Sequence, residues 1–336
     1  MLTSLWKSNN AFAIDLGTNN TLVYQPKRGI ILDEATSIAF DSKKHAFIHC
    51  GMSAKAIEGK SPANIEVMQP LCRGAIANLT VAKAYIKDII SRIATSRFFR
   101  PNIIVSVPSD LNSMERQAVI EAGIEGGAKS VQLLKDPFSA ALGSHFSIEY
   151  PRGILVLDNG AGVSEISLLS CNGIVMSQSL RMAGNDIDAM IIDHFKERKR
   201  VLLAQSDAER LKKELGNVFL EEERTMSIHV KNMMTRFPER FIASSIDVHE
   251  AILPAADKWV DLTHGMLSKL PPAFAQDVFD QGVVLTGGTS MLKGLDRYLS
   301  QKLKIAVHVV DNPLENIILG AGRALEEQRY AMLLGA

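Results

Sequence analysis

Two segments of this sequence repeat one pattern, in which a short apolar run is followed by an aspartate and a turn that contains glycine. The first is Asp-Leu-Gly-Thr-Asn-Asn at 15–20, and the second is Asp-Asn-Gly-Ala-Gly-Val at 158–163. Glycine lets backbone N–H groups approach an anion, and the carboxylates of Asp15 and Asp158 are suited to hold a metal-bound water. The duplication therefore predicts two similar lobes that grip one phosphate chain.

A third glycine turn, Gly287-Gly288, follows the apolar run 282–286. Each turn by itself is weak support for a phosphate site, because a strand followed by aspartate, a turn and glycine is common in α/β proteins. The alternative is that these glycines only form tight turns. Three such turns, each after a predicted strand, favour the phosphate site over that alternative.

The elements that must position these turns alternate between apolar strands and helices with one apolar face. The run 130–134 reads as a strand that delivers Lys-Asp-Pro at 135–137 to its carboxyl end, where ligands bind in open α/β sheets. The pattern predicts two α/β lobes, each with a small insertion. The predicted strands are 11–14, 21–24, 30–32, 37–40, 103–107, 130–134, 154–157, 165–169, 173–179, 225–230, 240–246, 282–286 and 307–310, and the predicted helices are 53–57, 80–93, 113–125, 187–200, 206–215, 248–267, 291–303 and 317–325.

Composition excludes several classes of protein. The chain has 336 residues, 46% of them hydrophobic, which is enough for two domains of ordinary size. Its formal net charge is zero, so we expect no nucleic-acid partner. Cys50, Cys72 and Cys171 lack metal-ligand spacing and fit ordinary buried thiols in a reducing compartment. Since no apolar run approaches the ~20 residues that span a bilayer and no signal-peptide core follows the N-terminus, we expect a cytoplasmic protein.

The sequence resembles the MreB-type bacterial actins, a family within the actin, heat-shock-chaperone and sugar-kinase superfamily. The resemblance extends from about residue 11 to about residue 327. Its combination of motifs is specific to the MreB type rather than to the superfamily. The matching segments are AIDLGTNNTLVY at 13–24, GKSPANI at 59–65, AERLK at 208–212, PPAFA at 271–275 and VLTGG at 284–288.

The resemblance implies an actin-like fold, with two similar α/β lobes around a central nucleotide cleft. We expect lobe I over 1–148 with an inserted subdomain at about 33–70, and lobe II over 149–310 with an inserted subdomain at about 181–247. The remaining residues, 311–336, are expected to form a helical segment that returns to lobe I.

The resemblance also implies ATP with Mg²⁺ in the cleft and self-assembly into filaments. These filaments would lie on the inner face of the cytoplasmic membrane and organise the cell-wall elongation machinery that gives rod-shaped cells their form. Asp15 and Asp158 would reach the metal ion through water. The residues expected to bind the nucleotide are Asp15, Gly17, Thr18, Asn19, Asn20, Asp158, Gly160, Ala161, Gly162, Glu209, Lys212, Gly287, Gly288 and Thr289.

The chain departs from the family pattern where hydrolysis would occur. The family usually has Glu-Glu-Pro where this chain has Lys-Asp-Pro at 135–137, and Gly-Gly-Gly-Thr-Thr where this chain has Asn-Gly-Ala-Gly-Val-Ser at 159–164. By the resemblance, Asp136 and Ser164 are the catalytic residues and Asp136 positions the attacking water, but aspartate is one methylene shorter than glutamate. Moving a catalytic carboxylate back by about 1 Å can lower the reaction rate ~100-fold. Val163 also removes a hydroxyl from the phosphate loop. We therefore expect a weak ATPase at most.

Two apolar features suggest a membrane surface. Leu2, Leu5 and Trp6 would share one side of a short N-terminal helix, as in an interfacial anchor. Phe98 and Phe99 lie between two arginines in a predicted loop, which by the resemblance carries the membrane-inserting pair. The alternatives are a disordered tail for the first feature and a loop tucked onto the core for the second.

Other functions are compatible with this superfamily. A nucleotide-binding scaffold that does not polymerise would keep the phosphate turns, and a small-molecule kinase would need a base facing a second substrate pocket. A chaperone-type ATPase would need a peptide-binding domain, for which 336 residues leave no room. The extent of the resemblance favours the filament.

Overall fold

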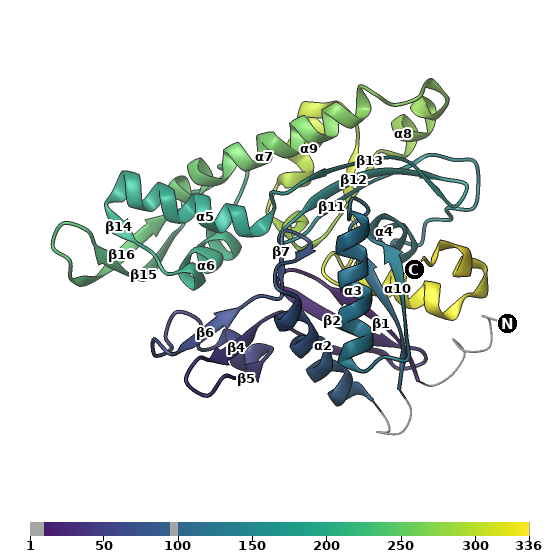
Figure 1. Cartoon of the computed structure of the whole chain (residues 1–336). Coiled ribbons are helices and arrows are strands. Elements are labelled where there is room, and N and C mark those ends of the chain that lie inside the picture. The colour runs from purple at the N-terminus through teal and green to yellow at the C-terminus, as the bar shows by residue number, and fades with distance from the viewer. Residues whose placement is uncertain (1–9, 95–99, 336) are drawn as a thin grey trace.

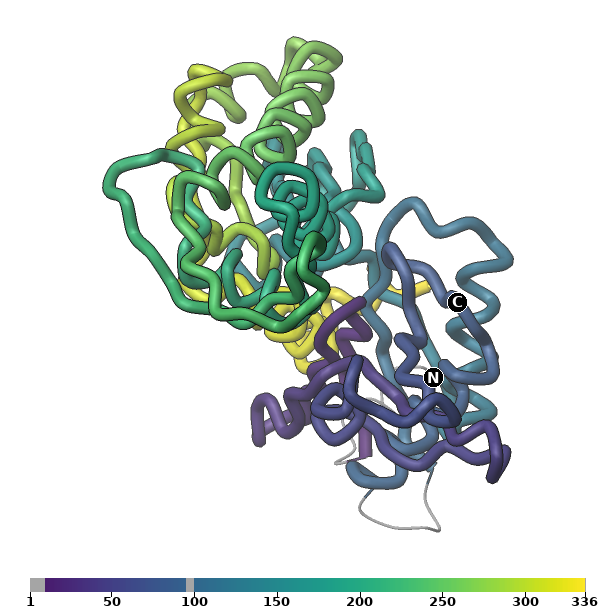
Figure 2. Tube along the Cα trace, turned by 90° about the vertical axis from the view of Figure 1, so that its left-hand side faces the viewer, coloured from purple at the N-terminus to yellow at the C-terminus, as the bar shows by residue number. Residues whose placement is uncertain are grey.

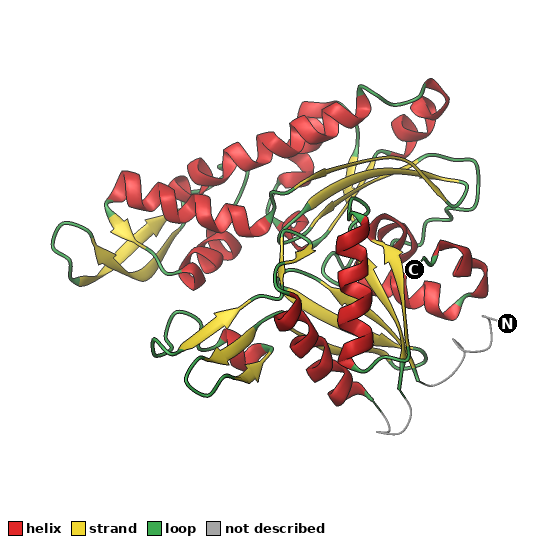
Figure 3. Cartoon of the chain, viewed as in Figure 1, coloured by secondary structure: helices red, strands yellow, loops and turns green. Residues whose placement is uncertain are grey.

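The protein has two α/β lobes, as the computed structural model shows for residues 10–94 and 100–335 (Figures 1 and 3). Each lobe is built on a five-stranded sheet, with strand order β10-β9-β1-β2-β3 in lobe I and β13-β12-β11-β17-β18 in lobe II. Seen from the side, the purple and blue lobe I and the green lobe II lie on opposite sides and meet in the middle, where yellow C-terminal chain lies (Figure 2). The strand bounds are β1 Ala11–Leu16, β2 Asn20–Gln25, β3 Gly29–Ala35, β9 Asn102–Val107, β10 Ser130–Lys135, β11 Ile154–Asn159, β12 Ser164–Ser170, β13 Gly173–Leu180, β17 Val283–Thr286 and β18 Val307–Val309.

Strand β1 is buried on both faces, as its continuous apolar sequence requires. Phe12 and Ile14 pack in one core with α2 (Leu79–Ile93) and α3 (Ser113–Gly126), whereas the alternate residues Ala11 and Ala13 pack with α4 (Asp136–Gly143) and α10 (Asn316–Glu326). Period-two alternation therefore decides which helices cover which face of the sheet.

Strand β11 of lobe II follows the same rule. Leu155 and Leu157 pack in the core of lobe II, while Ile154 and Val156 join the core that contains α4 and α10. The two lobes thus share one apolar layer at their base. The lobe II helices are α5 Gly184–His194, α6 Gln205–Leu215, α7 Ser245–Leu267, α8 Ala275–Gln281 and α9 Leu295–Leu303.

The two sheets place the aspartate turns at equivalent positions. In each lobe the turn joins an antiparallel hairpin, β1–β2 or β11–β12, whose first strand also pairs in parallel with a later strand. Asp15 lies opposite Ser106 and Asp158 lies opposite Thr286 in these parallel ladders. Both aspartates are therefore at the carboxyl edge of parallel strands, where ligands bind in α/β proteins.

Small sheets extend each lobe on the same side of the molecule (Figure 1). In lobe I, β4–β6 form a sheet beside the short helix α1 (Met52–Lys55), and in lobe II, β14–β16 form a sheet beside α6. Their bounds are β4 Ile38–Asp41, β5 Ala46–Cys50, β6 Ile65–Met68, β14 Val201–Leu202, β15 Thr225–Asn232 and β16 Pro238–Ser244, with β7 Leu71–Cys72 and β8 Ala75–Ile76 as a further pair near the cleft.

The chain returns to lobe I through α10, which packs closely on α4. A Cβ added at Gly320 would lie 1.8 Å from the backbone oxygen of Ser139, and one added at Gly143 would lie 2.0 Å from that of Asn316. These glycines let the two helices approach to backbone contact. The C-terminal residues continue in 3₁₀ turns at Gln328–Leu333 and end on β10 through the Leu133–Gly335 bridge.

Several predicted elements differ from the structure. The predicted start of the helix at 291–303 is wrong. Gly294 adopts φ +77°, which is not helical, and α9 begins only at Leu295. The helix predicted at 187–200 ends as α5 at His194 and continues as a π-helical turn to Lys199. The helices α4 and α8 were not predicted. The cysteines were expected to be buried, but Cys72 and Cys171 are exposed and Cys50 is partly exposed. No helix of the described residues is long and apolar enough to cross a bilayer.

Candidate nucleotide site

A cavity of about 500 Å³ opens between the two lobes. Its walls come from the turn after β1, the turn after β11, the turn after β17 and the helix α6. The structure thus brings together residues that are far apart in the sequence. Asp136 lines this cavity, and so does every residue predicted to bind nucleotide. These are Asp15, Gly17, Thr18, Asn19, Asn20, Asp158, Gly160, Ala161, Gly162, Glu209, Lys212, Gly287, Gly288 and Thr289.

The first two turns touch each other across the cavity. A Cβ added at Gly162 of lobe II would lie 2.5 Å from Thr18 Oγ1 and 3.0 Å from the Cα of Arg73, both in lobe I. A Cβ added at Gly74 would lie 2.7 Å from Val163 Cγ2. Glycine at positions 162 and 74 lets the two lobes come this close. The structure is therefore a closed arrangement of the lobes.

Hydrogen bonds hold the lobe II turns in shape. The N–H of Gly160 donates to the backbone oxygen of Val163 at 3.0 Å, and Thr289 Oγ1 donates to the backbone oxygen of Gly160 at 2.6 Å. Gly287 has φ +83°, and a Cβ there would meet the backbone oxygen of Asn159 at 2.3 Å. The second and third turns are therefore one rigid unit, with glycine required at 287.

Three partly buried carboxyl groups line the cavity. Burial raises the pKa of Asp15 to about 7, and burial with the charge of Asp15 raises that of Asp158 to about 7. Burial, followed by the charges of Asp15 and Asp158, raises the pKa of Asp136 well above its usual value. Asp136 Oδ1 is buried without a hydrogen-bond partner. A cation bound nearby would stabilise the ionised forms of these carboxyl groups and so reduce the repulsion among them.

The cluster fits a metal ion held through water rather than by direct protein ligands. Within 10–94 and 100–335 no three His, Cys, Asp or Glu side chains are arranged to bind a metal directly. Mg²⁺ commonly keeps several waters and is bound through one or two carboxylates and substrate phosphates. Asp15 and Asp158 are the residues that would hold such an ion.

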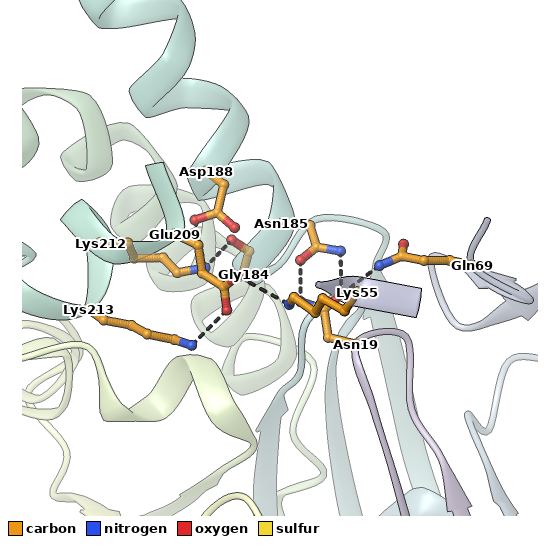
Figure 4. Close-up of polar contacts among 9 residues, drawn as sticks. All are labelled: Asn19, Lys55, Gln69, Gly184, Asn185, Asp188, Glu209, Lys212 and Lys213. Carbon is orange, nitrogen blue, oxygen red and sulfur yellow. Dashed lines mark hydrogen bonds and ion pairs between the residues drawn. The ribbon is translucent and has the colours of Figure 1, made fainter. Parts of the chain in front are cut away.

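Two lysines and two acids define the α6 side of the cavity (Figure 4). Lys212 Nζ donates to the backbone oxygen of Gly184 at 2.8 Å and pairs with Asp188 Oδ1 at 2.8 Å. Glu209 accepts from Lys213 at 2.6 Å and from Lys55 of lobe I at 3.2 Å. Asp188 is only 2% exposed, so Lys212 stabilises a buried carboxylate as well as lining the cavity.

Comparison with known proteins gives the family. A sequence model described as "MreB/Mbl protein" matches residues 9–332. The chain belongs to the MreB/Mbl family. It is 33% identical over 315 residues to the cell shape-determining protein Mbl of Bacillus cereus, which covers 93% of this chain and 95% of that protein. It is 33% identical over 327 residues to the cell shape-determining protein MreB of Pasteurella multocida, which covers 95% and 93%.

Solved structures agree on the fold. The fold matches MreB5 of Spiroplasma citri bound to AMPPNP with a TM-score of 0.90 and 28% identity, over 96% of this chain and 97% of that chain. It also matches the MamK double helical filament with a TM-score of 0.80 and 19% identity, over 95% and 99%, which shows the fold alone. The actin-like fold predicted from the sequence is confirmed, and the chain is an actin-like member of a family of cell shape-determining proteins.

Among the predicted site residues that the structure describes, Ser164 alone does not line the cavity. Its side chain is fully buried, with Oγ donating to the backbone oxygen of Met182 at 2.7 Å and accepting from Trp259 Nε1 at 2.8 Å. Val163, the preceding residue, does line the cavity. The contacts of Ser164 join β12 to α7, and its catalytic role stays a prediction.

Sequence reasoning missed several residues that line the cavity. Ser106 lies at the carboxyl end of β9, and that strand end is a signal that could have found it. Met291 and Leu314 line the cavity from the segments after β17 and β18, where no motif marks them. The predicted membrane residues Leu2, Leu5, Trp6, Phe98 and Phe99 lie outside the described residues.

The partly buried carboxyl groups predict a pH dependence. Because Asp15 and Asp158 have folded pKa values of about 7 against a usual 3.8, the ligand-free folded chain binds more protons than the unfolded chain between these values. Its stability should therefore fall as pH rises from about 4 to about 7. At pH 8, Asp15→Asn should raise the melting temperature of the ligand-free protein by ~5 °C, with a smaller gain at pH 5.

Thermal unfolding followed by circular dichroism, without nucleotide or divalent cation, checks this expectation. Asp207→Asn is the matched control, because Asp207 lies on α6 in an exposed pair with Arg210. An equal gain at both pH values would contradict the titration of Asp15.

Proposed function

We propose that this chain binds ATP with Mg²⁺ in the cavity between its lobes and polymerises into filaments. The observation that carries the proposal is the pair of aspartate–glycine turns that face each other across one cavity, beside three partly buried carboxyl groups with raised pKa values. Backbone N–H groups of such turns bind phosphate oxygens. The relative MreB5, at 28% identity, is solved bound to ADP and bound to AMPPNP, which supports the same ligand class here.

The chain's own residues have defined tasks in this proposal. The turns at 17–20 and 160–162 bind the phosphates from opposite lobes, and the bound Mg²⁺ neutralises phosphate charge. Asp136 orients the attacking water from the N-terminus of α4, but its short side chain makes hydrolysis slow. Nucleotide then acts mainly as an assembly ligand, which stabilises the closed arrangement of the lobes through contacts with both.

We further propose that the filaments lie on the inner face of the cytoplasmic membrane and organise cell-wall synthesis. The Mbl and MreB relatives are named for determining cell shape. Phe98 and Phe99, with Leu2, Leu5 and Trp6, would supply weak anchors that add along a polymer.

Sedimentation and electron microscopy with ATP, with ADP and without nucleotide test the polymer, beside a phosphate-release assay. We expect filaments that depend on nucleotide, with little phosphate released. Filaments in none of the three conditions, with phosphate transfer to an added sugar, would instead identify a small-molecule kinase. No filaments and no transfer, with nucleotide still bound, would identify a scaffold.

The membrane role predicts a specific loss. Replacing Phe98 and Phe99 together by serine should reduce flotation of the protein with anionic liposomes at least ~10-fold, because a buried phenylalanine contributes about 1.5–3 kcal/mol. Met114→Ser is the control, since Met114 is 81% exposed elsewhere on lobe I. Unchanged flotation of the double variant, with filaments intact, would remove this loop from the membrane contact.

A further inference from the structure

Side chains of the two lobes meet in a reciprocal amide pair beside the cavity (Figure 4). Asn19 Nδ2 of lobe I donates to Asn185 Oδ1 of lobe II at 2.7 Å, and Asn185 Nδ2 donates to Asn19 Oδ1 at 3.0 Å. Each amide thus uses one donor and one acceptor on the other. Both hydrogen bonds are partly buried, so the pair is a defined contact rather than two solvated side chains.

The amide pair connects the first phosphate turn to the start of α5, which in turn contacts the second phosphate turn. Asn19 belongs to the turn after β1, where its backbone oxygen accepts from the N–H of Thr36 at 2.8 Å. Asn185 lies at the start of α5, and its N–H donates to the backbone oxygen of Ala161 in the second turn at 2.9 Å. Gln69 Nε2, from the region of the lobe I insertion, also donates to Asn19 Oδ1 at 3.2 Å. Any separation of the lobes must break the pair.

Two ion pairs also join the lobes. Lys55 Nζ lies 3.2 Å from Glu209 Oε2, with side chains 32% and 21% exposed. Arg73 lies 3.3 Å from Asp186, with side chains 57% and 24% exposed. Lys55 and Arg73 come from the α1 and β7 region of lobe I, whereas their partners lie on α6 and α5 of lobe II.

We propose that the Asn19–Asn185, Lys55–Glu209 and Arg73–Asp186 contacts form a polar latch that controls how fast nucleotide leaves the cavity. This inference rests on the proposed nucleotide binding. All three contacts cross between the lobes, so opening the cavity breaks all of them at once. Asn19 and Glu209 line the cavity, but Asn185, Lys55, Arg73 and Asp186 do not, so substitutions at these four residues test the latch without removing a cavity-lining side chain.

The three contacts should not contribute equally. Exposed ion pairs contribute little because water and salt screen them, which makes Arg73–Asp186 the weakest. Lys55–Glu209 is less exposed, but Glu209 keeps Lys213 as a second partner. The amide pair has two hydrogen bonds, and Gln69 can replace only the one that Asn19 Oδ1 accepts from Asn185. We therefore expect the amide pair to dominate the latch.

The rate at which bound radiolabelled ADP is released tests the latch. Excess unlabelled ATP prevents rebinding, and the protein is kept at a concentration too low for filaments to sediment. Asn185→Ala should speed release ~10-fold, since it removes two hydrogen bonds. Lys55→Ala should speed it ~3-fold, and Arg73→Ala less than ~2-fold. Asn64→Ala is the matched control, because the Asn64 amide donates to Asp41 within the lobe I insertion.

A double variant separates the latch from general loosening of the fold. If Asn185 acts through Asn19, Asn185→Ala should hardly change release when Asn19 is already alanine. An unchanged release rate in Asn185→Ala, or an effect that persists fully with Asn19→Ala, overturns the latch while leaving nucleotide binding intact. Failure of the unsubstituted chain to retain ADP overturns the proposed function and the latch together. Melting temperatures within ~2 °C of the unsubstituted chain check that each variant folds.

Discussion

Asp136→Glu is expected to raise the rate of ATP hydrolysis about 100-fold. The Asp136 side chain lines the cavity from the first turn of α4, and its Oδ1 has no hydrogen-bond partner. Because Asp136 lines the cavity, the added methylene should carry the carboxylate about 1 Å further toward the proposed phosphate site, and a displacement of that size changes the rate of a positioned reaction ~100-fold. Phosphate release measures the effect, in single turnover with protein in excess over ATP and in multiple turnover with ATP in excess.

Two companion variants make this test specific. Val163→Thr places a hydroxyl on the cavity wall and should add to the gain of Asp136→Glu. Lys135→Glu is the control, because Lys135 precedes Asp136 but has an exposed side chain outside the cavity, so it should change the rate less than ~2-fold. If Asp136→Glu binds ATP and still releases phosphate at the original rate, the length of this side chain does not limit hydrolysis.

Gly162→Ala is expected to weaken nucleotide binding at least ~10-fold, because only the closed form has both turns in place to bind. The new Cβ would lie 2.5 Å from Thr18 Oγ1 and 3.0 and 3.1 Å from the backbone of Arg73, so the lobes cannot close as they do here. This clash lies between the lobes and not inside either core. The melting temperature without ligand should therefore change by less than ~3 °C.

Calorimetric titration with ADP measures the loss of affinity, and sedimentation measures the loss of filaments. Gly265→Ala is the matched control, because its nearest non-local atom, Gln178 Oε1, is 3.8 Å from the added Cβ. Full affinity in Gly162→Ala would show that the lobes bind nucleotide in an open arrangement.

The elements that sequence reasoning predicted best are those stabilised locally or patterned by burial. The helix predicted at 113–125 is observed as Ser113–Gly126, begun by a capping box in which Asn112 and Glu115 exchange hydrogen bonds. The error at 291–303 has a backbone cause, because Gly294 needs a left-handed conformation that its neighbours' apolar pattern does not reveal. The helix α8 was missed because its seven residues carry too little periodicity.

The sequence by itself determined the chemistry of the candidate site. An aspartate, a glycine turn and their duplication are local properties of a few consecutive residues, and each could be read without knowing its neighbours in space. The family pattern around 135–137 and 159–164 likewise predicts where hydrolysis should be impaired, and this prediction depends only on residue type.

Only the tertiary structure decided which residues meet across the cavity. Asn19 and Asn185 are 166 residues apart, and Ser164, beside Val163, turned away from the cavity to bond Trp259. Such contacts depend on how the two sheets and α4 and α10 pack in three dimensions. Because packing and lobe closure are collective, with no signature in any short segment, the latch and the partly buried carboxyl cluster could be recognised only once both lobes were in place.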